Sequence, residues 1–416
     1  MRKKYFFSDK RGEISLVPLA LMVVGIFSTS LFAVRGASAQ TQEPVTIGIV
    51  LPKQGFLGAG GTESAEGAML EVDARQSTVL GRPIKLIWYD EPNPQGAQQN
   101  MARVIDQDKA VAVVGGVASG PSFAMSSIAE RAKIPFMVVT AAAQELTGAR
   151  CNRYTFRTGI TVDVAVAAIM PALLKKGKNW YFLSADYAFG QQIYKTGSAL
   201  LKQDGGNLLG NEYVPVGTTD FSSQILKIRQ TSPDVIVAGQ GGDDVTNFLK
   251  QYKQYGGKST VGAPIVTDST ILAAGDQPNS LFGKPWHYTD PNNSAEEKAF
   301  VKTWRAKYKA PPSVSSWQGW MAMRMLLAAM SQAKSTSGPA IVAALENLRL
   351  DGGNLPNYYR SWDHQFIHQV DIVRTKPAGE DKWDVVDVVD RVPAKLSDVD
   401  ALFGTPEKIG CKMGGA

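Results

Sequence analysis

The sequence predicts an α/β protein built from two similar lobes, each with a mostly parallel sheet covered by helices on both faces. Short runs rich in Val and Ile alternate with helical stretches, a pattern typical of parallel sheets. The alternation starts at residue 45 and begins again near residue 162. The 416-residue chain, even without a leader of 39 residues, is longer than one hydrophobic core usually covers.

In the first repeat, buried apolar runs predict strands at residues 45–51, 84–90, 111–116 and 135–140. A Gly-rich loop is expected from Gly55 to Gly61, before a helix whose inner face carries Ala65, Ala68 and Val72. Pro92 and Pro94 mark a turn before a helix at 95–106, and a further helix precedes the fourth strand. The order is strand, helix, strand throughout.

The second repeat has the same rhythm. Helices are predicted at 162–175, 191–203, 221–230 and 245–255, and strands at 180–184, near 213–216, at 234–239 and at 264–268. Two long helices follow at 295–308 and 316–333, then a shorter one from Pro339, and two late strands at 368–375 and 383–389.

The first 39 residues predict a secretory signal peptide. A basic start and an apolar run at 14–34 end in Ala37-Ser38-Ala39, with cleavage expected near Ala39/Gln40. A membrane anchor is the alternative, because the apolar run is long enough to be considered one. Cleavage would place the mature protein in the periplasm.

The charge of the chain outside the leader is nearly balanced. Residues 1–39 hold six of the 44 Lys and Arg residues and two of the 38 Asp and Glu residues, which leaves 38 basic and 36 acidic side chains, a net charge of +2. A nucleic acid is therefore not an expected partner. The two cysteines, Cys151 and Cys411, are candidates for one disulfide in an exported protein; two free thiols are the alternative.

Motifs for catalysis fail on their details, so no cofactor, metal or catalytic residue is expected. The loop with Gly58 and Gly60 has Glu63 where the third glycine of a dinucleotide loop belongs. The run at 120–124 is one residue from a nucleophile elbow, but no histidine is suitably placed for a triad. His364 and His368 are four residues apart, in a stretch that predicts strand and loop; we expect solvated side chains, not metal ligands.

The ends of the predicted strands favour a binding site. Ligands of open α/β sheets bind beyond the carboxyl ends of the strands, and here these ends are small or polar. Ser119 stands at a predicted helix start, where free amides and the helix dipole favour a carboxylate; a simple N-cap role is equally open.

These residues resemble the type I periplasmic solute-binding proteins of ABC transporters, specifically the branched-chain (Leu/Ile/Val) amino-acid-binding family. The likeness covers nearly the whole mature chain. It rests on the order and spacing of several pieces: 45–51 with Glu66-Gly67-Ala68, 113–120, 134–140 with Glu145-Leu146-Thr147, 154–158, Asp186-Tyr187-Ala188-Phe189-Gly190 and Asp220-Phe221.

The resemblance implies two Rossmann-like lobes joined by a three-segment hinge. The N-terminal lobe would comprise 45–158 plus 287–352 and the C-terminal lobe 159–286 plus 353–405, with a tail at 406–416 tied by the disulfide. The ligand would be trapped between the lobes by hinge closure.

The resemblance also implies roles for individual residues. The ligand carboxylate would bind at Ser119, between Ala118 and Gly120, and Asp268 would meet an ammonium group. The other implied ligand-binding residues are small side chains after the fourth strand, an aromatic wall and a polar strand end: Ala141, Ala142, Tyr187, Phe189 and Gln240.

The chain departs from the family at three positions. Gly60, Ala142 and Gly241 stand where relatives carry an aromatic, a hydroxyl and another aromatic residue. The resemblance therefore implies an amino acid as the ligand, or a bulkier aromatic or aliphatic carboxylate or amide.

The expected role is that of a monomeric receptor that delivers its small-molecule ligand to an ABC permease in the inner membrane. A ligand-sensing subunit of a membrane receptor would have the same fold, and an enzyme on this scaffold is disfavoured by the missing catalytic groups.

Overall fold

The computed structural model describes residues 43–55 and 57–413. The predicted signal peptide lies outside the described residues. No helix within the described ranges is both long and apolar enough to cross a membrane. A disulfide joins Cys151 to Cys411, as the cysteine count predicted.

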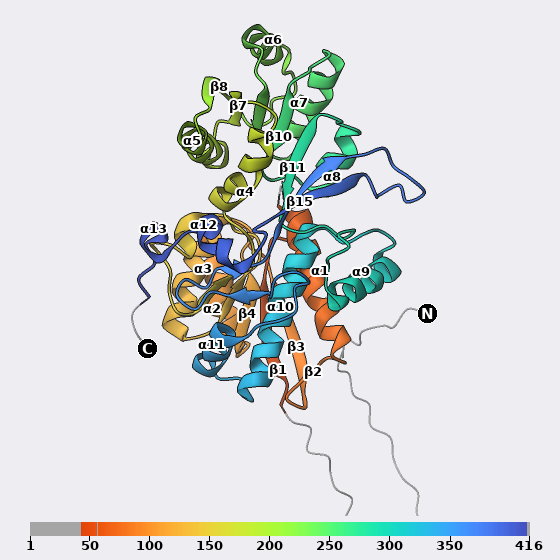
Figure 1. Ribbon diagram of the computed structural model, residues 1–416. Coiled ribbons are helices and arrows are strands. Elements are labelled where there is room, and N and C mark those ends of the chain that lie inside the picture. Colours follow the sequence, from red (N-terminus) through yellow and green to blue (C-terminus); the bar gives the residue numbers. More distant parts are fainter. Residues whose placement is uncertain (1–42, 56, 414–416) are drawn as a thin grey trace, which may run out of the picture. The chain divides into compact units, whose positions relative to one another are not determined.

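Two sheets, one in each lobe, organise the chain (Figure 1). The first sheet has the order β2-β3-β1-β4-β5-β6 and is parallel except for the β2–β3 pair. Its strands are β1 (Val45–Val50), β2 (Thr78–Val79), β3 (Arg82–Tyr89), β4 (Ala112–Gly115), β5 (Phe136–Val138) and β6 (Thr155–Arg157). Its helices are α1 (Gly58–Ala74), α2 (Pro94–Asp106) and α3 (Ser119–Ala132), with a short 3₁₀ turn η1 (Gln144–Leu146).

The second sheet has the order β15-β14-β11-β10-β9-β7-β8, with β14 and β15 antiparallel to their neighbours. Its strands are β7 (Asn179–Ala185), β8 (Asn207–Val214), β9 (Val235–Gly239), β10 (Thr260–Ala263), β11 (Ser280–Lys284), β14 (Val370–Thr375) and β15 (Val386–Val392). The intervening helices are α4 (Val162–Leu174), α5 (Ala188–Gln203), α6 (Ser222–Thr231), α7 (Gly242–Gln254) and α8 (Asp268–Ala274). These two sheets confirm the predicted α/β fold class.

The remaining elements connect the lobes or cover the first sheet. They are the helices α9 (Ala295–Tyr308), α10 (Val314–Ala333) and α11 (Gly338–Asn347), the ribbon β12 (Tyr358–Tyr359) and β13 (Phe366–Ile367), and the C-terminal turns η2 (Leu396–Asp398), α12 (Val399–Phe403) and α13 (Pro406–Ile409). The ribbon contributes Tyr359 and Phe366 to the core of the first lobe, whereas Ile367 packs into that of the second. The lobe boundaries expected from the sequence remain predictions.

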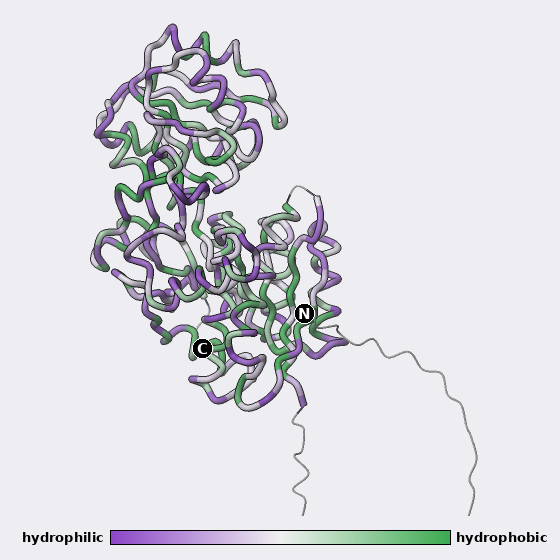
Figure 2. Tube along the Cα trace, turned by 90° about the vertical axis from the view of Figure 1, so that its right-hand side faces the viewer, coloured by the Kyte–Doolittle hydropathy of each residue, from purple (hydrophilic) through white to green (hydrophobic). Residues whose placement is uncertain are grey.

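Helices α1 and α10 pack side by side in the first lobe (Figure 1). Glycines allow this close approach: a Cβ on Gly67 would lie 2.0 Å from the Ser316 carbonyl oxygen, and one on Gly319 would lie 1.9 Å from that of Ser64. Helix α10 is buried around most of its circumference, which explains why its sequence is mostly apolar. The hydropathy colouring of Figure 2 shows hydrophobic segments concentrated inside the lobes.

The hinge contains a buried arginine. Arg157, at the end of β6, is fully buried, and its Nε donates to Gln365 Oε1 at 2.8 Å. Gln365 Nε2 in turn donates to the Gly159 carbonyl oxygen at 2.8 Å, so the first and third connections between the lobes are hydrogen-bonded to each other. Burial lowers the pKa of Arg157 to about 10, while Asp363 favours its charged form. Its guanidinium is therefore still charged at neutral pH.

Three local predictions are wrong. The strand predicted at 264–268 lies earlier, at Thr260–Ala263, and Asp268 instead begins α8. The glycine-rich loop ends at Leu57, because Gly58, Gly60 and Gly61 are already helical.

His364 and His368 are buried, not solvated: His364 stacks on Phe156 with ring centroids 3.8 Å apart, and its Nε2 lies 3.1 Å from Glu346 Oε1. Tertiary packing, which the local pattern does not encode, buries both rings.

Candidate functional site

The strand order of each sheet defines a topological switch point. In the first sheet the chain leaves β1 towards β3 on one side and returns to β4 on the other, and in the second sheet β7 is flanked in the same way by β8 and β9. Ligands of such sheets bind at this switch point, beyond the carboxyl ends of the two central strands. The predicted residues Ser119, Tyr187 and Gln240 all follow these strands.

The β4–α3 loop carries the predicted carboxylate position. Ser119 is the first residue of α3 and Ala118 is its N-cap, so the simple N-cap role considered for Ser119 is wrong. The Ser119 hydroxyl oxygen instead accepts a hydrogen bond from the Ala143 amide at 3.2 Å, which links this loop to the one after β5. The N-cap residue Ala118 has no side chain that could cap α3, and Gly120 is exposed. The structure thus leaves this helix end accessible.

A carboxylate that sequence reasoning missed organises the same loop. Glu91 follows β3 and is only 4% exposed, and its two oxygens accept hydrogen bonds from the amides of Gly116, Val117 and Ala118 at 2.9 to 3.2 Å. Burial raises its pKa to about 7, although the three amides favour the charged form. The only available sequence signal was its position at the end of a strand. Its side chain fixes the loop that presents Ser119.

The small residues after β5 lie beside this loop. Ala141 is buried, and its amide donates to the Gly116 carbonyl oxygen at 3.2 Å. Ala142 is half-buried and packs against the core cluster of the second lobe. Together with the Ser119–Ala143 hydrogen bond, these contacts bring Ala118, Ser119, Ala141 and Ala142 into one neighbourhood.

The second lobe supplies an aromatic surface after β7. Tyr187 is 40% exposed and stacks on Phe189 with ring centroids 5.9 Å apart. A Cβ on Gly241, which follows β9, would lie 3.5 Å from the Tyr187 hydroxyl. The two predicted aromatic residues therefore lie together, next to the end of the neighbouring strand.

Gln240 has an unusual environment. It directly follows β9 and is 1% exposed, yet neither atom of its side-chain amide has a hydrogen-bond partner within the described residues. Nearly all buried polar groups in proteins are hydrogen-bonded, and an unpaired one costs about 1–3 kcal/mol. An amide left unpaired at a switch point indicates a partner supplied from outside the chain.

Asp268 already has a cationic partner. Its Oδ1 accepts from the ammonium group of Lys284, the last residue of β11, whose side chain is 0% exposed. His287 Nε2 lies 3.5 Å from the same oxygen. Although burial favours the neutral acid, the Lys284 ammonium holds the pKa of Asp268 below its usual range. Sequence reasoning missed Lys284 because the strand that ends in it was not predicted.

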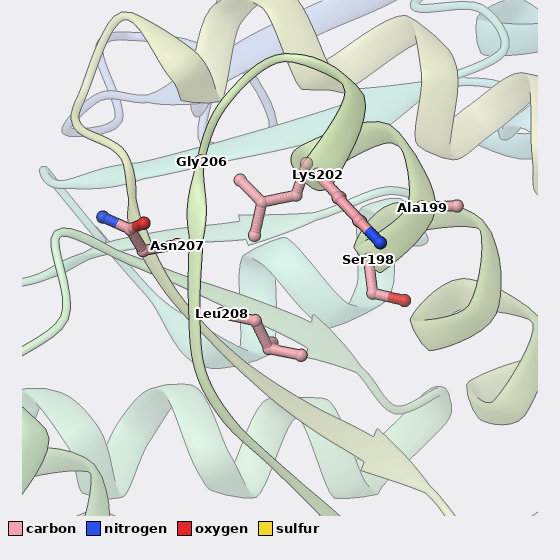
Figure 3. A pocket seen from close by; sticks show the side chains of 7 residues that line it. Ser198, Ala199, Lys202, Gly206, Asn207 and Leu208 are labelled. Atoms are coloured by element: carbon pink, nitrogen blue, oxygen red, sulfur yellow. The ribbon is translucent and has the colours of Figure 1, made fainter.

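One hollow of the described structure lies away from these strand ends. A cavity of about 470 Å³ lies between α5 and the start of β8, and its lining includes Lys202, Asn207 and Leu208 (Figure 3). None of the predicted site residues lines it, and it adjoins the amino end of β8 instead of the carboxyl ends of the strands. We therefore place the candidate site at the switch points and not in this cavity. No cluster of potential metal ligands occurs among the residues that the structure describes.

Two lobes with parallel sheets, a hydrogen-bonded hinge and polar strand ends are the features of a two-lobed solute-binding protein. Comparison with known families agrees: the family model described as periplasmic binding protein matches residues 44–381. The chain belongs to this family, whose members bind solutes and work with ABC transporters, and its resemblance to the branched-chain branch is confirmed by curated relatives.

Individual relatives are distant. Leu/Ile/Val-binding protein homolog 7 of Brucella abortus (strain 2308) is 26% identical over 353 residues, 79% of this chain and 87% of that protein. The amino acid ABC transporter substrate-binding protein of Pseudomonas fluorescens Pf-5 has a TM-score of 0.81 at 23% identity, covering 89% of this chain and 99% of the other. A solute-binding protein of Rhodopseudomonas palustris in complex with benzoate has a TM-score of 0.74 at 22% identity, covering 89% and 100%. These solved structures show the fold.

Proposed function

We propose that the protein is a periplasmic receptor of an ABC importer that captures a small amino-acid-like ligand between its lobes. Hinge closure buries the ligand, and the loaded monomer delivers it to an inner-membrane permease. The predicted cleavage near Ala39/Gln40 would release the receptor into the periplasm. Mass analysis of the exported protein tests this last point, because cleavage predicts a chain that starts at Gln40.

The unpaired amide of Gln240 carries the proposal. Its donor and acceptor, both buried at the end of β9, match the polar groups of an amino acid or amide. The N-terminus of α3 supports it, because Ala118 provides no side-chain cap there and a helix N-terminus is suited to a carboxylate. Tyr187 and Phe189 add an apolar wall for the ligand's side chain.

A simple carboxylate or amide is the second candidate. Lys284 already neutralises Asp268, so a ligand without an ammonium group would leave no unpaired charge on that residue. The relative solved with benzoate shows that the fold accepts an aromatic acid in at least one other protein.

The experiment combines identification of the ligand with a matched pair of variants. Mass spectrometry of small molecules released from the denatured protein, followed by a thermal-shift panel of amino acids, amides and aromatic acids, identifies the class that binds. Gln240→Met should weaken binding of the identified compound at least about 10-fold. The ligand-free protein should be at least as stable as the wild type, because no hydrogen bond is lost and a buried unpaired amide is removed. Gln365→Met, which removes hydrogen bonds within the hinge, should lower stability.

Two outcomes would contradict the proposal. No released compound and no thermal shift with any member of the panel would argue against a solute receptor. Unchanged affinity in Gln240→Met would remove Gln240 from the site.

A further inference from the structure

A small polar cavity lies where the second and third connections between the lobes meet. Its volume is about 30 Å³. Trp286, from the second connection after β11, lines it together with Asn357 and His368, from the third connection before β14. Because a water molecule needs about 10–15 Å³ of such space, the cavity has room for water or a small ion and for no larger ligand. None of the predicted ligand-binding residues lines it, so it is distinct from the candidate ligand site.

Three side chains in the wall of this cavity each carry a buried nitrogen that lacks a hydrogen-bond partner. The atoms are Trp286 Nε1, Asn357 Nδ2 and His368 Nε2, and none has a partner among residues 43–55 and 57–413. The three residues are 5%, 3% and 3% exposed. Nearly all buried polar groups in proteins are hydrogen-bonded. Three such atoms around one cavity therefore indicate a partner that the chain itself does not supply.

The surroundings of the three nitrogens define which of them donate. His368 Nδ1 lies 2.6 Å from the Gln369 carbonyl oxygen, which can only accept, so Nδ1 carries a hydrogen. Burial lowers the pKa of His368 to about 4, against the carbonyl groups of Gln369 and Pro285, so the ring is neutral at pH 7 and Nε2 is an acceptor. The indole nitrogen of Trp286 and the amide nitrogen of Asn357 can only donate. The cavity thus offers two donors and one acceptor.

The cavity does not suit an ion of either sign. Its two N–H donors would repel a cation, and the carboxyl groups in its wall have other partners. Asp290 Oδ2 accepts from Arg391 Nε at 2.7 Å, and Glu297 Oε1 accepts from the indole of Trp317 at 2.8 Å. Burial and the charge of Asp290 raise the pKa of Asp371 well above its usual value, which favours its neutral form. An anion would face the charges of Asp290 and Glu297 and the lone pair of the acceptor nitrogen.

We propose that this cavity binds an ordered water molecule, the hinge water, that bridges the second and third connections between the lobes. A water molecule can accept from Trp286 and Asn357 and donate to His368, and buried waters typically make about three such hydrogen bonds. The hydrogen bond from Gln365 to Gly159 already links the first and third connections. The hinge water adds the second connection to this network, whichever ligand the protein binds.

Water contact at the Trp286 indole tests the proposal in solution. In the ¹⁵N-labelled protein, cross-relaxation is measured between water and each tryptophan indole N–H, and Trp286→Phe assigns the Trp286 signal. We expect this N–H to show NOE and ROE signals of opposite sign to water, which distinguish a bound water molecule from hydrogen exchange. Trp180 is the internal control, because it is 0% exposed and its Nε1 donates to the Gly177 carbonyl oxygen at 2.8 Å.

A matched pair of variants tests the role of the cavity. Asn357→Leu replaces one donor by methyl groups of similar size, so it should displace the hinge water and reduce the water contact of Trp286 to the level of Trp180. Asn354→Leu is the control, because Asn354 is exposed in the same connection and does not line the cavity. It should leave the Trp286 contact unchanged, and thermal melting verifies that both variants fold.

A crystal structure of the wild-type protein gives a readout that needs no variant. We expect an ordered water molecule within hydrogen-bond distance of Trp286 Nε1, Asn357 Nδ2 and His368 Nε2, and no anomalous peak there after soaking in bromide or rubidium salts. The absence of density, or an anomalous peak from a bound ion, would overturn the proposal. A Trp286 indole without water contact, or a contact that persists in Asn357→Leu, would overturn it as well.

Discussion

Lys284 and Asp268 form an ion pair, and we expect the two side chains to stabilise the folded protein as a unit. Removing one partner of a buried pair costs about 3–5 kcal/mol, because the other charge stays buried and uncompensated. Lys284→Met leaves Asp268, whose side chain is 24% exposed and partly rehydrated, so we expect a loss near the lower end, about 3 kcal/mol. Asp268→Asn leaves the wholly buried Lys284 and should cost about 4–5 kcal/mol.

The double variant decides whether the pair acts as a unit. With both charges removed, the loss should be smaller than in either single variant, which gives a coupling energy of at least about 4 kcal/mol in the double-mutant cycle. Urea unfolding of the ligand-free protein, followed by tryptophan fluorescence and circular dichroism, measures the four free energies; coincident transitions verify a single unfolding step. Single effects that add within about 0.5 kcal/mol would refute the ion pair.

The pH dependence gives a second measurement of the same pair. Because the pKa of Asp268 is lower in the folded protein than in the unfolded chain, its stabilisation is complete above pH of about 4 and is lost as the pH falls through the folded value. The difference in stability between the wild type and Asp268→Asn should therefore shrink below pH of about 4.

Three further perturbations test other parts of the structure. Gly319→Ala would place a Cβ 1.9 Å from the Ser64 carbonyl oxygen and push α10 away from α1. We expect the free energy of unfolding in urea to fall by about 1–3 kcal/mol or more. An unchanged midpoint of the urea transition would contradict the close packing of the two helices. Replacing Cys151 and Cys411 by Ser opens a loop with a sequence separation of 260 and should cost about 2–5 kcal/mol, with no added effect of reductant on the variant. Burial raises the pKa of Glu91 to about 7, so the contribution of this group to folding stability is complete below pH of about 4.5 and is lost as the pH rises through 7. The difference in stability between the wild type and Glu91→Gln should therefore fall by about 3 kcal/mol from pH 4.5 to 8. A difference that stays constant over this range would argue against a raised pKa.

The periodicity of the sequence predicted most of the helices and strands, because the local pattern of each one agrees with the element that it forms. The helix at Ala295–Tyr308 matches its prediction at both ends, since a capping box of Ser294 and Glu297 marks its start. The strand Thr260–Ala263 was misplaced because Gly262 interrupts its apolar pattern, while the apolar residues after it form a loop. Gly262 fits there because a Cβ would lie 2.5 Å from Leu173, a contact between distant parts of the chain.

The candidate site was predictable only in part. The positions of Ser119, Tyr187 and Gln240 follow from the order of the strands, because polar residues after strands mark the switch points. The partners of site residues do not follow, since they depend on contacts across long sequence separations. Glu91 and Ala118 are 27 residues apart, and no local pattern pairs them.

The pairing of Asp268 and the environment of Gln240 bear on which ligand groups stabilise the closed state. A ligand stabilises the closed state only by interacting more favourably with it than with the open state. Lys284 already pairs with Asp268, so an ammonium group has to share that carboxylate with a buried cation. The side-chain amide of Gln240 is buried and has no hydrogen-bond partner among the described residues, so each hydrogen bond that it makes to a ligand is gained on binding. On the proposed function, selection of the ligand therefore depends on Gln240 more than on Asp268.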